Sequence, residues 1–526
     1  MPTLPVQPAE FHVFDTSLRD GAQQEGLHLS VTDKLKIAGY LDELGVTFIE
    51  GGWPGANPAD TEFFRLAGEL GLRRSKLVAF GATRKAGVRA ADDPLTRALV
   101  DAGTEYVCIV AKAHEDHVRR ALRTTLEENL AMITDTVSFL KAEGRRVFVD
   151  AEHFFDGYRA HPEYAIRVVQ TAHDAGAEVV VLCDTNGGML PSWIGDIVRA
   201  AARTGAKLGV HVHNDTACAV ANTIAAVEAG VMHVQGTFNG YGERTGNADL
   251  SAVIPNLQLK FGWEVLPAAQ LADLTRVAHA ISMVAHQPLL GRTPYVGHSS
   301  FAHKAGLHAS AIKVDENLYQ HIDPALVGND MRMLISDMAG RANIQIKGEQ
   351  LGFDLDDREL AARITEVVKA REAEGYSYES ADASFEMLLR EQLGALDLPF
   401  EVESWRVFTE ERGGETISEA TVKLTAKGMR QMVVGEGNGP VNALDAALRA
   451  ALTPAFPSVA DFELTDYKVR LLDEGHGTDA TVRTLIDTSF DGASWTTVGV
   501  GTNVIEASWE ALSDALAYGI MTHLDA

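Results

Sequence analysis

Residues 207–215 read Lys207-Leu208-Gly209-Val210-His211-Val212-His213-Asn214-Asp215, an apolar run that ends in two histidines, an amide and an acid. Side chains of a β-strand alternate in direction, so a strand here would point both imidazoles to one face and Val212 to the other. Two histidines on one face form a common half-site for a divalent metal ion. The alternative is that they are ordinary polar residues at a strand end, and the position of the strand in the fold decides between the two.

This strand is one of a series, because short β-branched runs alternate with longer helical patterns from residue 11 to about residue 260. Eight strands are predicted, at His12–Asp15, Thr47–Gly51, Lys76–Phe80, Tyr106–Val110, Arg146–Asp150, Glu178–Cys183, Leu208–His213 and His233–Phe238. Glycine accepts the left-handed conformation just past a helix end. Such glycines close most of the intervening helices, at Gly45, Gly71, Gly103, Gly144, Gly176, Gly205 and Gly230. Ser30 and Asp33 have the spacing of a capping box that opens the first helix.

Eight strand–helix units of this length predict a (β/α)8 TIM barrel. A doubly wound open sheet is the structural alternative, although no GxGxxG motif follows the first strand. In a barrel of this kind the catalytic residues lie at the carboxyl ends of the strands. Those ends carry acids, histidines, an arginine and amides, in the segments 15–21, 49–52, 150–153, 183–186, 211–215 and 239–247. A single acid would be explained as a helix cap or a loop ion pair, and it is their convergence on one mouth that predicts an active site.

The bulk properties of the chain limit its partners. Its 526 residues are too many for one core and predict two or three domains. The net charge of -27 is spread along the chain and argues against nucleic acid, since phosphate binding needs a basic surface. No apolar run reaches membrane-spanning length, and the first six residues lack the features of a signal peptide. We therefore expect a cytoplasmic location without a membrane partner.

Four motifs carry a resemblance to a known family. They are Asp-Thr-Ser-Leu-Arg-Asp-Gly-Ala-Gln at 15–23, His-Val-His-Asn-Asp at 211–215, Gly-Glu-Arg-Thr-Gly-Asn-Ala at 242–248 and Gly-Leu-His-Ala at 306–309. The chain resembles the metal-dependent enzymes that condense acyl-CoA with α-keto acids, the isopropylmalate, homocitrate and citramalate synthases of the DRE-TIM metallolyase group. The first three motifs together are highly specific, and the resemblance covers nearly the whole chain.

The resemblance implies a metal centre. Asp20, His211 and His213 would hold a divalent metal ion, and Asn247 falls at the position that completes the protein ligands. This mixed ligand set leaves Zn²⁺, Mn²⁺ and Mg²⁺ open. Such an ion acts as a Lewis acid and can polarise the keto group of an α-keto acid.

The resemblance also implies roles in catalysis and substrate binding. Arg19 would point into the site and stabilise the developing alkoxide or hold a carboxylate, and Thr185 would contact the keto acid carboxylate. A base must take a proton from the thioester methyl group. Glu152, in a loosely matching Ala-Glu-His-Phe-Phe segment, is one candidate, and His308 helped by Tyr319 is the other. We prefer His308 with Tyr319 for proton handling and Glu152 for supporting the site.

The predicted domains are a TIM-barrel catalytic domain at 1–275, helical linker subdomains at 276–398 and a C-terminal α+β domain at 399–526. The last domain carries a weak repeat, because 419–423 parallels 479–483 and 435–438 parallels 499–502, each followed by an Ala-rich helix. Two ββα-like units are therefore expected. The resemblance implies a regulatory domain that dimerises and binds an end-product amino acid, with Gly-rich turns at 435–439 and 499–501 as candidates for its carboxylate. A purely stabilising or dimerising domain is the alternative.

The choice of keto acid depends on two segments. Residues 49–58 depart from the Glu-Val-Gly-Phe-Pro pattern of isopropylmalate synthases and, together with 183–188, look like the longer citramalate synthases. A bulky Trp53 would shrink the pocket toward pyruvate. The first expectation is an acyltransferase that condenses acetyl-CoA with pyruvate to (R)-citramalate and CoA in isoleucine biosynthesis, with isoleucine as effector and a homodimer as assembly. Synthesis of 2-isopropylmalate from 2-ketoisovalerate is second, and homocitrate synthesis is third.

Two other functions remain open at this point. A lyase on the same metal scaffold is disfavoured by the additional C-terminal domain. A non-catalytic amino-acid sensor on a degenerate barrel would have lost its metal ligands, yet all four positions are present.

Overall fold

The structure is a computed structural model that describes residues 5–267, 269–336, 338–472 and 480–524. The first four residues of the N-terminal segment and Asp479 of the predicted repeat lie outside these ranges. Two compact units are present, Met1–Phe301 with Ile322–Asp330, and Ala302–His321 with Met331–Ala526. None of the helices in the described ranges combines the length and the apolar character that crossing a membrane requires.

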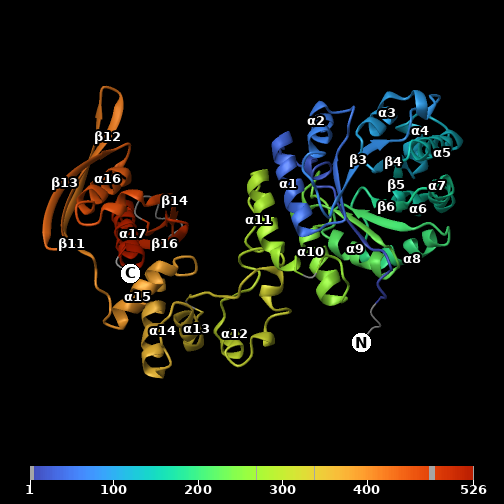
Figure 1. Ribbon diagram of the computed structural model, residues 1–526. Helices are drawn as coiled ribbons and strands as arrows, with labels where there is room; N and C mark the ends of the chain where they lie inside the picture. The colour runs from blue at the N-terminus through green and yellow to red at the C-terminus, as the bar shows by residue number, and fades with distance from the viewer. Residues whose placement is uncertain (1–4, 268, 337, 473–479, 525–526) are drawn as a thin grey trace. The chain divides into compact units, whose positions relative to one another are not determined.

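The first unit is built on eight parallel strands that close into a barrel in chain order (Figure 1). The strands are β1 His12–Asp15, β2 Phe48–Gly52, β3 Lys76–Ala82, β4 Tyr106–Lys112, β5 Arg146–Glu152, β6 Val179–Asp184, β7 Leu208–Val212 and β8 His233–Gly236. The barrel prediction is confirmed, and the open doubly wound sheet is wrong because β8 pairs with β1. β1 has the predicted bounds, and the bounds of the other seven strands differ from the prediction by one or two residues.

Helices surround the barrel, as the blue to green ribbons of Figure 1 show. They are α1 Val31–Leu44, α2 Pro58–Ala67, α3 Pro94–Asp101, α4 Glu115–Arg120, α5 Leu126–Ala142, α6 Phe154–Ala160, α7 Pro162–Ala175, α8 Pro191–Ala202, α9 Ala219–Glu228, α10 Leu250–Pro255 and α11 Leu274–Ala285. Ser30 and Asp33 form the predicted capping box of α1. Gly45 and Gly176 close α1 and α7 in the left-handed conformation, with φ of 92° and 94°.

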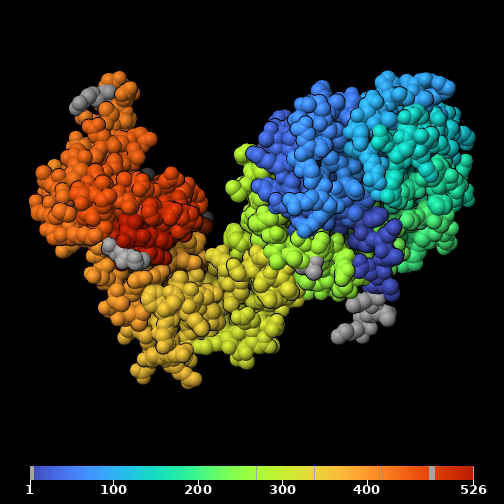
Figure 2. All heavy atoms as spheres, viewed as in Figure 1, coloured from blue at the N-terminus to red at the C-terminus, as the bar shows by residue number. Residues whose placement is uncertain are grey.

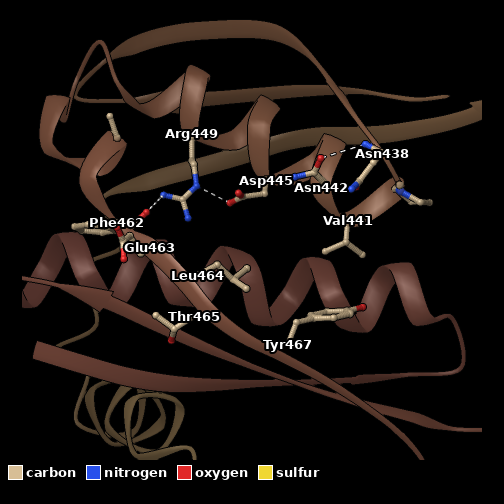
Figure 3. Close-up of a pocket in the computed structure, with 13 residues that line it drawn as sticks. Asn438, Val441, Asn442, Asp445, Arg449, Phe462, Glu463, Leu464, Thr465 and Tyr467 are labelled. Atoms are coloured by element: carbon tan, nitrogen blue, oxygen red, sulfur yellow. Dashed lines mark hydrogen bonds and ion pairs between the residues drawn. The ribbon is translucent and has the colours of Figure 1, made fainter. Parts of the chain in front are cut away.

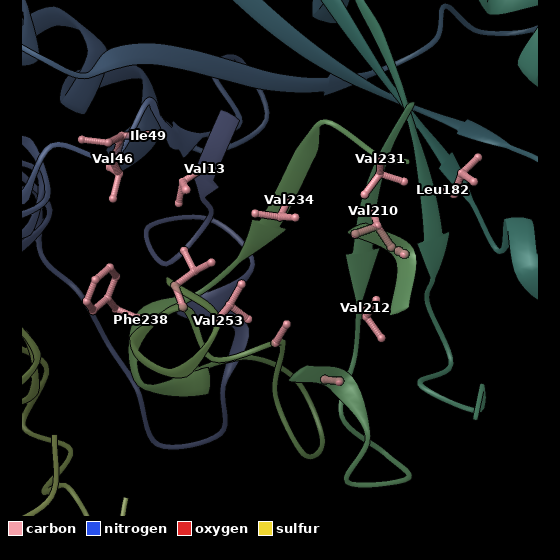
Figure 4. Close-up of a cluster of buried hydrophobic side chains, with 14 of the residues drawn as sticks. Val13, Val46, Ile49, Leu182, Val210, Val212, Val231, Val234, Phe238 and Val253 are labelled. Atoms are coloured by element: carbon pink, nitrogen blue, oxygen red, sulfur yellow. The ribbon is translucent and has the colours of Figure 1, made fainter. Parts of the chain in front are cut away.

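The barrel strands separate two layers of buried side chains. Val210, Val212 and Val234 point outward into the apolar layer that Figure 4 shows. Phe14 and Phe148 belong to a separate inner cluster that fills the floor of the barrel. Because strand side chains alternate, the inward positions that follow this floor bring polar residues to the mouth of the barrel. Figure 2 shows one outer face of this unit, coloured blue to green, with all heavy atoms drawn as spheres.

The second unit begins with short linker elements. They are the two-stranded sheet of β9 Ala302–His303 and β10 Arg332–Met333, and the helices α12 Gly306–Ile312, α13 Arg341–Gln350, α14 Arg358–Ala373 and α15 Asp382–Gln392. The C-terminal module follows with two three-stranded antiparallel sheets and two helices. Its elements are β11 Phe400–Arg412, β12 Glu415–Ala426, β13 Met429–Gly437, α16 Pro440–Leu452, β14 Glu463–Leu471, β15 Val482–Phe490, β16 Ala493–Gly501 and α17 Val504–Gly519.

The C-terminal repeat is confirmed, but each unit contains three strands and a helix instead of two strands and a helix. The aligned motifs covered only the second and third strands of each unit. Gly435 and Gly499 also lie inside strands and not in turns. A Cβ atom on Gly435 would be 2.4 Å from the backbone nitrogen of Ala447, and one on Gly499 would be 2.1 Å from the carbonyl oxygen of Ala507. These glycines therefore permit the close approach of α16 and α17 to the sheets.

Candidate active site

The predicted metal ligands meet at the mouth of the barrel. His211 lies in β7 and His213 directly follows it, and both point inward while Val212 points outward. Asp20 comes from the turn after β1. Its Oδ2 atom is 3.6 Å from Nε2 of His211 and 3.9 Å from Nε2 of His213. All three residues are buried, and their ligand atoms lie within 4.8 Å of one another.

Asn247 stands beside this cluster. An isolated antiparallel bridge pairs it with His213, and its Nδ2 atom donates to Oδ1 of Asp20 at 3.3 Å and to the carbonyl oxygen of Tyr241 at 3.0 Å. Its Oδ1 atom is buried and has no hydrogen-bond partner among the described residues. A buried acceptor without a partner costs free energy, and a bound cation would satisfy it.

Arg19 joins the metal-ligand cluster to a second buried carboxylate. Its Nε atom donates to Glu50 at 2.7 Å and its Nη1 atom donates to Asp20 at 2.8 Å. The guanidinium carbon lies 3.8 Å from the centre of the Phe80 ring. Burial lowers the pKa of Arg19, but the carboxylates of Glu50 and Asp20 outweigh burial and raise it above its usual value.

The electrostatics keep the three ligands in the forms that bind metal. Burial raises the pKa of Asp20, but Arg19 and the two histidines outweigh burial and hold it well below its usual range. Burial, followed by the charge of His211, lowers the pKa of His213 to about 4. Burial also lowers the pKa of His211. At neutral pH the site therefore offers one carboxylate and two neutral imidazoles, which is the protonation state that metal ligation requires.

A cavity of about 460 Å³ opens over the cluster. Its wall includes Trp53, so the indole faces the site. Trp53 meets Phe80 edge to face, with ring centroids 5.4 Å apart. The other lining residues include Arg19, Asp20, Lys112, Asp150, Glu152, Thr185, His211, His213 and Arg244. The cavity thus combines an aromatic wall with cationic and acidic groups.

Two further predicted site residues line this cavity. Thr185 Oγ1 accepts a hydrogen bond from the backbone N–H of His153 at 2.9 Å, which leaves its own hydroxyl proton free to donate. Glu152 forms an ion pair with Lys112. This partner makes Glu152 part of a fixed charge pair at the cavity wall.

His308 and Tyr319 belong to the second compact unit, and the other predicted site residues belong to the first. Within that unit they stack on each other, with ring centroids 4.2 Å apart and an interplanar angle of 28°. Tyr319 is 40% exposed. His308 and Tyr319 therefore contact each other, and their role in proton transfer remains a proposal.

Several site residues had no predicted role. Glu50, Asp150 and Gln235 occupy inward positions two residues after Phe48, Phe148 and His233 of the barrel floor. A polar residue two positions after a buried ring is a signal that sequence reasoning could have used. Lys112 was missed because the predicted strand ended at Val110, and β4 continues to Lys112.

Three family models match successive parts of this chain. Residues 10–281 match the HMGL-like family, 295–375 match the homocitrate synthase post-HMGL domain-like family, and 379–520 match the LeuA allosteric (dimerisation) domain. The chain belongs to the HMGL-like family. It is 61% identical to an (R)-citramalate synthase of Streptomyces coelicolor, over 97% of both chains. It is 47% identical to an (R)-citramalate synthase of Synechocystis, over 97% of this chain and 96% of the other.

A more distant relative gives a useful contrast. A 2-isopropylmalate synthase of Lysinibacillus sphaericus is 29% identical over 96% of both chains. The high identity to citramalate synthases over nearly the full length makes this chain an HMGL-like enzyme of the condensing class with a LeuA-type C-terminal domain. The family is metal-dependent, and the cluster of Asp20, His211 and His213 is the candidate metal site.

Proposed function

We propose that this enzyme condenses acetyl-CoA with pyruvate to form (R)-citramalate and CoA, with a divalent metal ion held by Asp20, His211 and His213. The main support for this proposal is that the three residues of this buried cluster line the same cavity as Arg19 and the Trp53 indole. The relatives support pyruvate as substrate, because sequence identity falls from 61% and 47% for the citramalate synthases to 29% for the isopropylmalate synthase.

The residues fit a divalent metal ion. Two imidazole nitrogens face one carboxylate oxygen, and the unpartnered Oδ1 atom of Asn247 lies beside them. When bound, the ion would polarise the keto group of the substrate as a Lewis acid. Arg244 Nη2 lies 3.2 Å from Nδ1 of His213 and also binds Asp215. If the metal binds Nε2 of His213, the proton of the neutral imidazole lies on Nδ1. That protonated nitrogen cannot accept a hydrogen bond, so Arg244 would lose its contact with Nδ1 and keep its bonds to Asp215.

The keto acid would be oriented by two groups at the cavity wall. The Thr185 hydroxyl has a proton to donate to the substrate carboxylate. Arg19 is always cationic and can stabilise the negative charge that develops on the keto oxygen as the carbon–carbon bond forms. Glu50 and Asp20 hold its guanidinium in place, so little reorganisation is needed during the reaction.

The carbon nucleophile forms when a base takes a proton from the methyl group of acetyl-CoA. We assign this step to His308 with Tyr319, whose stacked rings form a unit within one segment. Glu152 would support the site, and its ion pair with Lys112 favours this role over that of a free base. Thioester hydrolysis then releases CoA and draws the reaction forward. A loss of proton exchange from acetyl-CoA in His308→Ala, with metal content unchanged, is the outcome expected of this assignment.

We further assign the C-terminal module to feedback by isoleucine. A cavity of about 940 Å³ lies between the start of α16 and β14 (Figure 3). Val441 and Leu464 offer an apolar wall, while Asn438, Asn442 and Tyr467 offer polar groups. An amino acid with a branched apolar side chain suits this mixture of surfaces.

We also propose a homodimer through this module. Phe408, Met432 and Val434 are apolar residues of its first sheet that are 61%, 62% and 53% exposed. An exposed apolar face of this kind indicates a protein interface, and the match to the LeuA allosteric (dimerisation) domain supports a second copy as the partner.

The deciding experiment is the release of free thiol from acetyl-CoA in the presence of Mn²⁺, Mg²⁺ or Zn²⁺. Pyruvate, 2-ketoisovalerate and 2-oxoglutarate are compared as acceptors. Strong preference for pyruvate is expected. Preference for 2-ketoisovalerate would make the enzyme an isopropylmalate synthase, and no release with any acceptor would reject the condensation.

A further inference from the structure

The C-terminal module contains another cavity, of about 540 Å³, which has no part in the proposed reaction or in the proposed isoleucine site. It lies between the start of β11 and the middle of α17. Apolar side chains of Leu398, Phe400 and Val402 form one side, and the indole of Trp509 forms the other. Its polar lining residues are Glu401, Thr425, Lys427, Ser513 and Asp514.

The internal repeat relates this cavity to the one between α16 and β14. Both first strands carry an irregularity at matching places, between Val402 and Ser404 in β11 and between Leu464 and Asp466 in β14. One cavity uses α16 with β14, and the other uses α17 with β11. The two cavities therefore occupy equivalent places in the repeat. Each cavity combines the helix of one repeat unit with the first strand of the other.

The chemistry of the two cavities differs at one place. When the two repeat units are aligned so that Gly435 matches Gly499, Arg449 of α16 matches Ser513 of α17. The Arg449 guanidinium donates to Asp445 at 2.7 Å and to the carbonyl oxygen of Phe462 at 2.6 Å. In the cavity beside α17 this cation is replaced by a small hydroxyl group.

The cavity beside α17 nevertheless keeps an acid. Burial, followed by the charge of Glu510, raises the pKa of Asp514 to about 7, and the charge of Arg371 opposes them. No hydrogen bond contributes to this shift, and the described residues supply no ion pair to the carboxyl group. The cavity thus combines the carboxyl group of Asp514 with the indole of Trp509 and free volume.

We propose that this cavity binds a small molecule that carries a primary ammonium group on an apolar body. The ammonium group would pair with Asp514, and the body would lie against Trp509 and Phe400. Simple amines and free amino acids share this chemistry, and the test below distinguishes them. The inference is independent of the reaction assigned to the barrel, because it rests only on residues of the C-terminal module.

The test uses the full chain labelled with 5-fluorotryptophan. The Trp509 resonance is assigned with the Trp509→Phe variant, and Trp193, which is 39% exposed on α8, serves as an internal reference. The probes are isoleucine, 2-methylbutylamine, which lacks the carboxylate, and 3-methylpentanoate, which lacks the ammonium group. Both ammonium compounds are expected to shift the Trp509 resonance and 3-methylpentanoate is not. Tighter binding of isoleucine than of the amine identifies an amino acid as the ligand class.

Two variants and one control separate this cavity from its equivalent. Asp514→Asn removes the charge, and Ser513→Arg supplies the cation that Arg449 supplies in the equivalent cavity. Each is expected to weaken amine binding about tenfold or more, since a charge-assisted bond is lost or already satisfied. Asn442→Ala, in the cavity beside α16, is expected to leave binding unchanged. No shift at millimolar amine, an equal response to 3-methylpentanoate, unchanged binding in Asp514→Asn, or loss of binding in Asn442→Ala would each overturn the proposal.

Discussion

The Nδ1 atom of His211 lies 2.9 Å from the Oε1 atom of Gln235. The amide nitrogen of Gln235 in turn donates to Asp150 at 3.1 Å, which directs its oxygen toward the imidazole. An amide oxygen only accepts hydrogen bonds, so His211 carries its proton on Nδ1 and leaves Nε2 free to face Asp20. Partners of this kind orient metal-binding imidazoles and raise their basicity.

Substitution of Gln235 should therefore weaken the metal site without removing a ligand. Gln235→Leu is expected to lower the affinity for a divalent metal about 10- to 100-fold, because the orientation and tautomer of His211 are no longer set. Metal binding is measured by competition with a chromophoric chelator, and Gln170→Leu on α7 is the matched control. Equal affinities in the two variants would contradict a positioning role for Gln235.

The metal itself should be required for thiol release. Treatment with a chelator, or the substitution Asp20→Ala, is expected to reduce activity about a thousandfold, because a Lewis acid contributes several kcal/mol to the transition state. Elemental analysis should show metal in the untreated protein and in a control, Asp174→Ala at an exposed position of α7, but not in Asp20→Ala. Full activity in a metal-free preparation would refute the proposed centre.

The indole of Trp53 should limit the size of the keto acid. Trp53→Ala is expected to raise kcat/KM for 2-ketoisovalerate relative to pyruvate about tenfold, since added room for one or two methyl groups has an effect of this size. Steady-state thiol release with both acceptors measures the ratio. Trp193→Ala, an exposed position on α8, should leave the ratio unchanged. The size argument fails if the Trp53 variant keeps the ratio of the natural sequence.

The carboxyl group of Asp514 should make stability depend on pH. Its pKa is raised in the folded chain from 3.8 to about 7. A raised pKa means that the folded state binds the proton more tightly, so this contribution is present at low pH and is lost as the pH rises through about 7. Asp514→Asn should therefore raise the Tm by a few degrees above that pH. The difference should shrink toward pH about 4, and a difference that is constant with pH would show that this carboxyl group titrates normally.

The exposed apolar face of the first C-terminal sheet should hold the dimer together. Introducing charge with Met432→Glu and Val434→Glu is expected to convert a dimer into a monomer, because two copies cannot bury these carboxylates. Light scattering after size-exclusion chromatography measures the mass. Val6→Glu combined with Leu70→Glu, two exposed residues of the first unit, provides a control with the same change in charge. A dimer that persists in the double variant would place the interface elsewhere.

The sequence predicted much of the barrel because its information is local. Alternating β-branched runs located all eight strands, and Ser30 with Asp33 located the start of α1. The motif resemblance pointed to Asp20, His211 and His213, which the structure brings together. Local patterns were weaker at strand ends, where Lys112 was missed by two positions, and in the C-terminal module, where the first strand of each repeat was not found.

By itself, the sequence determined the order of the strands, the inward direction of both histidines and the existence of a C-terminal repeat, because each depends on neighbouring residues and on the fixed alternation of a strand. Only the tertiary structure decided that Trp53 faces the cavity, that Glu50 holds Arg19 and that Asp514 and Phe400 line one cavity. These relationships join residues far apart in the chain, and their geometry depends on how whole elements pack.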